Sequence, residues 1–275
     1  MGFARRELMP ICAVFSMMAV MPVVEPSAVG TWFPSRVVQA PAQASALPFR
    51  PRPILDRVDW KGRAVPLATM LEATHTNAFL VVQDNVVVHE WHRRGTGPAT
   101  LFPSWSVAKS VVSLLVGSAV ARGKLSETDR VSDLLPELRS AAVFGKITVR
   151  NLLDMTSGLA VPENYDPRHP LTGTAGMYLT RDITAFVRDH AQLAFKPGSE
   201  GRYRSIDTEV LGLILARVEG KPLADLLSER IWKPMGAQAE ATWNLDRTGG
   251  VEKAFCCINA TARDFARLGL LVADQ

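Results

Sequence analysis

The sequence is poor in cysteine, with three in 275 residues. Cys12 stands in an N-terminal apolar stretch, and Cys256 and Cys257 are adjacent. Because neighbouring cysteines rarely bridge each other, the sequence predicts no disulfide framework. A basic stripe with interleaved aromatic residues is also missing, since the net charge of +4 is scattered along the chain. This pattern argues against a nucleic acid as partner.

Two common hydrolase signatures are absent as well. There is no Gly-x-Ser-x-Gly sequence, which disfavours the catalytic triad of an α/β-hydrolase. There is no His-Glu-x-x-His sequence either, and His89 and His92 are placed in a predicted strand so that they point to opposite faces. We therefore expect no metal site, and nothing in the pattern calls for a cofactor.

No internal apolar run is long enough to cross a membrane. The most apolar segment leaves only twelve residues between Lys109 and Arg122, whereas a spanning helix needs about 20. At the N-terminus, Arg5-Arg6 precede the apolar stretch 11–24, and small residues follow at 28–30. This order predicts a signal peptide over residues 1–30, a periplasmic or secreted protein, and no stable membrane span after signal removal.

The rest of the composition is that of a globular protein with a sizeable core, at 47% hydrophobic and 21% charged residues. Residues 31–65 are rich in Pro, Ala and Arg and are predicted to form an extended lead-in. Residues 66–275 are predicted to form one domain. Within it, residues 78–83 and 86–91 read as two strands around an Asp84-Asn85 turn, a hairpin signal.

Helix signals dominate the remainder of the chain. We expect a helix over 104–121 closed by Gly123, and a short helix over 149–155 capped by Thr148. Two more helices are expected with Thr180 and Asp207 as their caps, and the second of these ends near Gly220. Another helix is expected over 222–231. Thr261 and Asp264 form a capping-box variant that opens a last amphipathic helix, whose apolar side carries Phe265, Leu268, Leu270 and Leu271. A lone hairpin is too little sheet to stand by itself, so further strands are expected downstream of Gln275.

The segment 104–121 also carries the strongest candidate for chemistry. Lys109 is its single charge and stands three residues after Ser106, on the same helix face. Removal of a lysine from water disfavours its charged form, which would let Lys109 take the proton of a serine hydroxyl. The helix dipole favours the resulting negative charge near Ser106. The alternative is a lysine that extends to solvent in a tetrapeptide that often arises by chance.

A second candidate lies in the segment 201–207, just before a predicted helix. Tyr203 is followed two residues later by Ser205, so a phenol and a hydroxyl can enter one cleft. A lysine nearby would favour loss of the phenol proton, and Tyr203 could then relay protons to a leaving group. The alternative is a loop tyrosine with a structural role.

Taken together and in this order, these motifs resemble the serine β-lactamase and penicillin-recognising enzyme superfamily, and most of all its class C-like branch. The resemblance runs from about Thr76 to Gln275 and is carried by Ser106-Val-Ala-Lys109, by residues 152–159 and 197–205, and by Cys256-Cys-Ile-Asn-Ala-Thr-Ala-Arg-Asp264. It implies an α/β (α+β) fold with a helical lobe and an antiparallel sheet lobe. Tyr-x-Ser in place of Tyr-x-Asn favours the esterase and amide-hydrolase members, among them family VIII esterases and 6-aminohexanoate-oligomer hydrolases.

The resemblance also implies roles for individual residues. Ser106 matches the acylated nucleophile, Lys109 its base and Tyr203 the proton-relaying phenol. Ser205 matches the polar side chain that orients them, and Tyr165 falls in a loop that borders the substrate cleft. The family's third motif, Lys-Thr-Gly or His-x-Gly, does not occur before Gln275. The sheet lobe is therefore predicted to lack its C-terminal strands, and the chain is predicted to be a C-terminally truncated member.

Two hypotheses for function follow. The first is a secreted or periplasmic serine hydrolase that cleaves an ester, amide or peptide-like small molecule through an acyl-enzyme on Ser106. The second is a non-catalytic ligand-binding protein, or an inactive fragment, that keeps the cleft without the chemistry. Covalent labelling by a serine-directed probe separates the two hypotheses.

Overall fold

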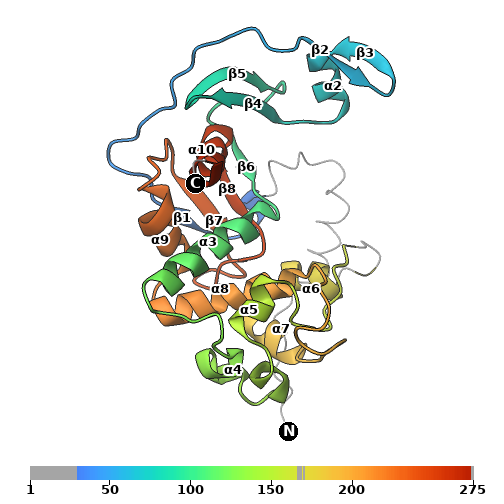
Figure 1. The fold of residues 1–275 in the computed structure, drawn as a ribbon, viewed down its shortest axis with the longest axis vertical. Helices are drawn as coiled ribbons and strands as arrows, with labels where there is room; N and C mark the ends of the chain where they lie inside the picture. The colour runs from blue at the N-terminus through green and yellow to red at the C-terminus, as the bar shows by residue number, and fades with distance from the viewer. Residues whose placement is uncertain (1–29, 166–168, 170, 274–275) are drawn as a thin grey trace.

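The computed structural model describes residues 30–165, 169 and 171–273. The predicted signal peptide lies outside these residues, apart from Gly30 at its end. A helical region occupies the lower part of the view in Figure 1, a four-stranded sheet the middle, and a hairpin region the top. The predicted mixture of a helical lobe with antiparallel sheet is confirmed.

The four-stranded sheet has the order β1-β7-β8-β6 and is antiparallel throughout. Its strands are β1 (Ser35–Val38), β6 (Leu101–Pro103), β7 (Ala241–Asn244) and β8 (Ile258–Thr261). The predicted lead-in thus supplies an edge strand, with Val38 fully buried. Sequence patterns missed β6, β7 and β8 because these strands are short and β8 is buried at every position, so no alternation of apolar and polar residues marks it.

The predicted hairpin is present as β4 (Ala78–Gln83) and β5 (Val86–His92). Asp84 and Asn85 have φ of 52° and 60°, the conformation of a tight hairpin turn, which Asn and Asp tolerate well. A second, small hairpin, β2 (Arg57–Trp60) and β3 (Arg63–Pro66), leads into α2 (Leu67–Ala73). An ion pair from Arg263 to Glu90 ties β5 to the helix beneath it in Figure 1.

The helical region is built around α8 (Ser205–Glu219), which packs against most other helices. Its first eight residues are all buried, so α8 forms the centre of the core. The helix predicted over 104–121 is α3 (Val107–Ala121), which begins at Val107, and Gly123 follows it with a φ of 67°. The other helices are α4 (Val131–Leu134), α5 (Val149–Leu153), α6 (Gly173–Leu179), α7 (Ile183–Asp189), α9 (Leu223–Leu227) and α10 (Ala262–Ala273), with short turns η2 (Pro136–Leu138), η3 (Ala142–Gly145) and η4 (Ser228–Trp232).

Most predicted helix boundaries hold, and two caps differ. Thr148 caps α5 in a capping box, and Thr261 accepts a hydrogen bond from the Asp264 N–H at the start of α10. The cap of α7 is Asp182, which accepts from Ala185 N at 2.9 Å, and not Thr180. Asp207 is no cap either: it lies inside the first turn of α8, where its side chain turns inward to Ser157.

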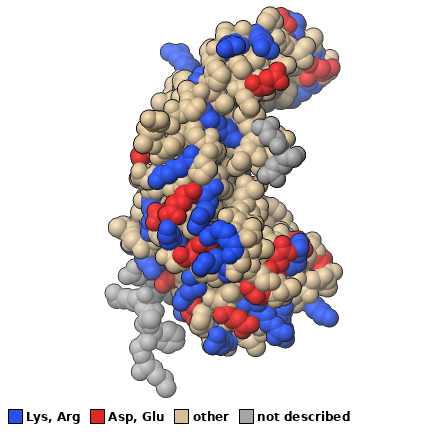
Figure 2. Space-filling model, turned by 60° about the vertical axis from the view of Figure 1, so that its left-hand side comes forward, with Lys and Arg blue, Asp and Glu red and all other residues tan. Residues whose placement is uncertain are grey.

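Charges of both signs are mixed on the face of the molecule that Figure 2 presents, where Lys and Arg are interspersed with Asp and Glu. In the part of the chain that the structure describes, no helix combines the length and apolar character that a bilayer crossing requires. The apolar side of α10 is narrower than predicted, because Leu268 is buried while Leu271 is 39% exposed.

Candidate active site

Ser106 and Lys109 meet at the start of α3. Ser106 is the N-cap residue and is exposed, while Lys109 in the first turn is buried. Lys109 Nζ donates a hydrogen bond to Ser106 Oγ at 3.1 Å. The predicted pair is therefore brought together, with the amine on the protein side and the hydroxyl on the solvent side.

Lys109 is held from two other directions. Its Nζ donates to the Phe255 carbonyl at 2.9 Å, and the Tyr203 ring centroid lies 5.0 Å from Nζ. Tyr203 itself is 52% exposed. Serine hydroxyl, lysine amine and tyrosine ring thus form one group that opens to solvent on the Ser106 and Tyr203 side.

The residue before the candidate nucleophile has an unusual backbone. Trp105 has a φ of 43°, in the left-handed region that large side chains seldom adopt. Its ring stacks on Tyr178 at 6.3 Å, and Tyr178 in turn meets Phe33 edge to face at 5.0 Å. Backbone strain of this kind clusters at functional sites, where surrounding contacts hold it in place. The Trp105 side chain is 44% exposed, next to Ser106 in the chain.

Ser205 and Tyr165 contact a residue that sequence reasoning did not select, Glu163. The Ser205 hydroxyl and N–H donate to the Glu163 carboxylate at 2.7 and 2.8 Å, Thr174 donates at 2.9 Å, and the Tyr165 hydroxyl also donates to it. No hydrogen bond from Ser205 to Lys109 or Ser106 occurs among the described residues. Glu163 stands two residues before Tyr165 in the same loop, but no spacing in the sequence pointed to its contact with Ser205.

The electrostatics of this cluster follow from its hydrogen bonds. Burial opposes ionisation of Glu163, but the donors from Tyr165, Ser205 and Thr174 outweigh it and hold the pKa of the carboxyl below its ordinary value. Partial burial and the hydrogen bond to Glu163 raise the pKa of Tyr165. The carboxylate is thus charged, and Tyr165 is a neutral hydrogen-bond donor beside Tyr203. All three tyrosines of the chain, residues 165, 178 and 203, surround the candidate site.

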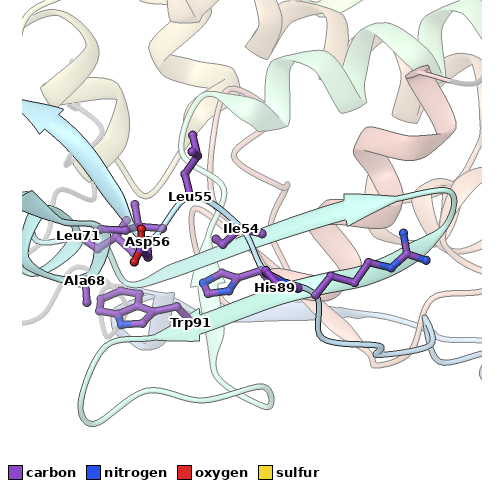
Figure 3. A pocket seen from close by; sticks show the side chains of 10 residues that line it. Ile54, Leu55, Asp56, Ala68, Leu71, His89 and Trp91 are labelled. Atoms are coloured by element: carbon purple, nitrogen blue, oxygen red, sulfur yellow. The ribbon is translucent and has the colours of Figure 1, made fainter.

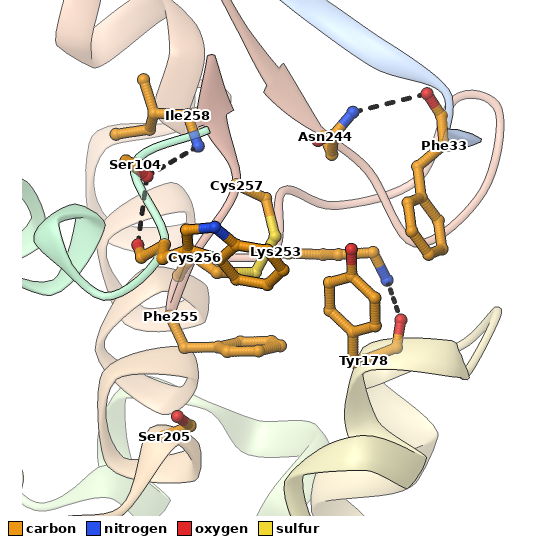
Figure 4. The surroundings of a disulfide bond; sticks show 12 residues. Phe33, Ser104, Tyr178, Ser205, Asn244, Lys253, Phe255, Cys256, Cys257 and Ile258 are labelled. Atoms are coloured by element: carbon orange, nitrogen blue, oxygen red, sulfur yellow. Dashed lines mark hydrogen bonds between the residues drawn. A yellow bond between two sulfur atoms is a disulfide. The ribbon is translucent and has the colours of Figure 1, made fainter. Parts of the chain in front are cut away.

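The structure corrects the expectation for the two neighbouring cysteines, because Cys256 and Cys257 form a disulfide with each other. Cys257 has a φ of 76°, in the left-handed region. The expectation that adjacent cysteines do not bridge rests on their spacing in the sequence and takes no account of this backbone conformation. The pair lies between Phe255 and Ile258, close to Lys253 and Tyr178, as Figure 4 shows.

Two further buried groups lie behind the site. The Asp207 carboxylate accepts from Ser157 Oγ at 2.5 Å, and burial raises the pKa of Asp207 to about 7. Lys253 is fully buried, donates to the Tyr178 carbonyl at 2.8 Å, and lies over the rings of Phe33 and Tyr178. Burial lowers the pKa of Lys253 to about 8.

Two cavities lie on the hairpin side of the molecule. One of about 480 Å³ is lined by Trp105 and Pro103 together with residues of β4 and α10, so it adjoins the Ser106 turn. The other, of about 500 Å³, lies between the lead-in, α2 and β5, where Figure 3 shows Ile54 and Leu55 near His89 and Trp91. This second cavity contains none of the predicted site residues. Among the described residues no group of His, Cys, Asp and Glu side chains could hold a metal ion.

The fold and the site define a protein of the β-lactamase/transpeptidase-like class. A beta-lactamase family model matches residues 69–275, and the chain belongs to this family. It is 31% identical over 235 residues to the 6-aminohexanoate-dimer hydrolase of Paenarthrobacter ureafaciens, covering 82% of this chain and 59% of that protein. It is 34% identical over 154 residues to esterase EstB of Burkholderia gladioli, covering 50% of this chain and 37% of the esterase.

A solved structure agrees with these sequence relatives. A provisionally named 6-aminohexanoate-dimer hydrolase from Bacillus anthracis superposes with a TM-score of 0.79 at 27% identity, covering 91% of this chain and 68% of the other. The predicted family membership and fold are thus confirmed, and the homologues are hydrolases. This chain spans less than two thirds of the length of both curated relatives.

Proposed function

We propose that the protein is a serine hydrolase that cleaves an ester or a linear amide through an acyl-enzyme on Ser106. The observation that carries this proposal is the contact between Lys109 Nζ and Ser106 Oγ at 3.1 Å, with a buried amine and an exposed hydroxyl. A nucleophile and a base within hydrogen-bond reach, with the base held by a third group, is the arrangement that nucleophilic catalysis needs. Here the third group is the Phe255 carbonyl.

The proposed reaction runs in two steps. In its uncharged form, Lys109 takes the proton of Ser106 as Oγ bonds to the substrate carbonyl carbon. The Ser106 N–H at the start of α3 stabilises the developing oxyanion, since helix N-termini favour negative charge. The Tyr203 phenol, over the amine of Lys109, passes the proton to the leaving alcohol or amine as the bond to it breaks. Water then bonds to the acyl carbon and gives one proton to Lys109, the bond from that carbon to Ser106 Oγ breaks, the acid leaves, and Lys109 returns the proton to Ser106.

The substrate class is proposed from the relatives and from the wall of the site. The relatives are named for a linear amide, the 6-aminohexanoate dimer, and for esters. The residues beside Ser106 are the aromatic rings of Trp105 and Tyr178, with Tyr165 and Tyr203 as exposed phenols. Such a surface suits an acyl chain flanked by one or two hydrogen-bonding groups. A periplasmic or secreted location, predicted from residues 1–30, belongs to the same proposal.

Pre-steady-state kinetics with p-nitrophenyl butyrate test this proposal. We expect a burst of nitrophenolate whose amplitude matches the enzyme concentration, followed by slower turnover, because acylation of Ser106 releases the first product. Ser106→Ala should remove both phases. Parallel assays with the 6-aminohexanoate dimer and with nitrocefin separate ester, linear amide and β-lactam as substrates.

An unchanged rate in Ser106→Ala would refute the proposal. Saturable binding of these compounds without any turnover or covalent label would instead favour the alternative, a ligand-binding protein that keeps the cleft without the chemistry.

A further inference from the structure

The Cys256–Cys257 disulfide lies between two residues that each hold one part of the candidate active site. Before it, the Phe255 carbonyl accepts the hydrogen bond of Lys109 Nζ. After it, the Ile258 carbonyl accepts from Ser104 N at 2.6 Å, and the Ile258 N–H donates to Ser104 Oγ at 3.1 Å. Ser104 stands two residues before Ser106. The two disulfide-bonded cysteines therefore join Phe255, which holds Lys109, to Ile258, which holds the turn that carries Ser106 (Figure 4).

The backbone of this link is fixed in an uncommon conformation. Cys257 has a φ of 76°, in the left-handed region that side-chain-bearing residues seldom adopt and glycine adopts readily. Its carbonyl accepts from Asn244 N at 3.0 Å, and the Cys256 carbonyl accepts from Trp243 Nε1 at 3.0 Å. Both cysteines are buried. The disulfide and the hydrogen bonds from β7 therefore act on the same two residues.

We propose that the Cys256–Cys257 disulfide is a positioning element of the active site. It holds Cys257 in the left-handed conformation and so keeps the Phe255 carbonyl aimed at Lys109 while Ile258 holds Ser104. Without the sulfur–sulfur bond, residue 257 relaxes toward a negative φ, and the carbonyl that orients Lys109 turns away. This inference rests on the proposed roles of Ser106 and Lys109.

The state of the two cysteines is tested first. The native protein is alkylated with iodoacetamide in denaturant, with and without prior reduction by dithiothreitol, and the peptide containing residues 256–257 is analysed by mass spectrometry. We expect two labels after reduction and none without it. Two labels on this peptide from unreduced, active protein would overturn the proposal.

Positioning is then separated from mere stabilisation by two variants of identical composition. Cys256→Ala/Cys257→Gly restores an easy left-handed residue at position 257, whereas Cys256→Gly/Cys257→Ala puts the glycine one residue too early. A displacement of about 1 Å at an active site costs about 10²-fold in rate. We expect kcat for p-nitrophenyl butyrate to fall by about that factor in the second variant and to stay at least fivefold higher in the first, with KM nearly unchanged in both. Equal kcat values in the two variants, or a wild-type kcat in the second, would overturn the proposal.

A control variant accounts for lost stability. Leu138→Ala removes a buried side chain from η2, which packs against α4, so Tm should fall while kcat below the transition stays at the wild-type value. A comparable loss of kcat in Leu138→Ala would mean that destabilisation alone explains the cysteine variants.

Failure of the proposed function is distinguishable from failure of this inference. If the wild-type protein shows no Ser106-dependent turnover, the proposed function fails and hydrogen exchange at the Ile258 N–H decides the positioning role by itself. Faster exchange in Cys256→Gly/Cys257→Ala than in Cys256→Ala/Cys257→Gly supports it. Equal exchange rates in the two variants overturn it.

Discussion

Two lysines are buried in the part of the chain that the structure describes, and their surroundings differ in one decisive respect. Lys109 points to an exposed hydroxyl, Ser106, and lies beneath an exposed phenol, Tyr203. Lys253 donates to the Tyr178 carbonyl and lies over the rings of Phe33 and Tyr178, and among the described residues it donates no hydrogen bond to a solvent-facing hydroxyl. Burial of a lysine therefore indicates an unusual role, but a catalytic role also requires a reactive partner that is exposed to solvent.

The charges around the two lysines also differ. Glu209 and Asp246 act on Lys253, and their attraction partly offsets the burial that lowers its pKa. Burial raises the pKa of Glu209 to about 8. Lys253 thus belongs to a closed group of buried ionisable side chains, while Lys109 belongs to a group that opens to solvent.

The largest expected effects come from replacing each lysine by methionine. Lys109→Met should lower kcat by about 10²–10⁴-fold, because it removes the proposed general base, while the protein stays folded. Lys253→Met should lower the free energy of unfolding by about 3 kcal/mol, because it leaves buried carboxyl groups without their counter-charge, and kcat of the folded protein should change by less than tenfold. Steady-state kinetics and urea unfolding of both variants check this; a catalytic loss of equal size in both would erase the distinction.

Tyr203→Phe sharpens the comparison on the open side. The ring over Lys109 Nζ remains, but the proton-relaying hydroxyl is lost, so we expect kcat to fall by about 10²-fold with little change in unfolding. Tyr178→Phe is the matched control on the closed side, since Tyr178 contacts Trp105 and Lys253 through its ring and its carbonyl. A similar loss of kcat in Tyr203→Phe and Tyr178→Phe would mean that the Tyr203 hydroxyl has no special role.

Glu163→Gln is expected to have a smaller effect, chiefly on KM. The carboxylate accepts hydrogen bonds from Ser205, Thr174 and Tyr165, and an amide cannot accept all of them in the same geometry. Loosening of Tyr165 should raise KM severalfold and lower stability by about 1–3 kcal/mol. Glu200→Gln, at an exposed ion pair with Arg202, should change neither quantity. An unchanged KM in Glu163→Gln would exclude Tyr165 from substrate binding.

The last expected effect concerns stability alone, as a pH dependence caused by Asp207, with no change in kcat predicted. Burial raises the pKa of Asp207 from 3.8 to about 7, so the folded protein holds a proton that the unfolded chain has released between those values. Stability on this account falls as pH rises from about 4 to 7, by at most about 1.4 kcal/mol per pH unit. Asp207→Asn should remove this slope in urea unfolding measured from pH 4.5 to 7.5. The same slope in both proteins would rule out Asp207 as its source.

Contacts between residues close together in the sequence were predicted, and contacts between residues far apart were missed. Ser106 and Lys109 were predictable because three residues on a helix determine their contact, and Asp84-Asn85 because a turn depends on its own residues. The Phe255 carbonyl lies 146 residues from Lys109, and Glu163 lies 42 residues from Ser205. Such contacts depend on how α8 and the loop 253–257 pack, which local patterns do not encode.

The edge strand and the disulfide were missed for related reasons. β1 pairs with β7 across about 200 residues, and its four residues carry no alternation strong enough to mark a strand. The Cys256–Cys257 bond occurs with Cys257 in the left-handed conformation, and no glycine next to the pair indicates such a conformation in the sequence. By contrast, the capping residues Thr148 and Thr261 were predictable because their hydrogen bonds span three residues.

The most direct test of the account is the site of covalent labelling by a fluorophosphonate. The wild-type protein is incubated with the probe, digested and analysed by mass spectrometry, beside Ser106→Ala and Lys109→Met. The account predicts one phosphonylated residue, Ser106, with no label in Ser106→Ala and labelling slowed by at least tenfold in Lys109→Met. A label on another serine, or a labelling rate in Lys109→Met equal to that of the wild type, would contradict the claim that the buried amine of Lys109 activates Ser106.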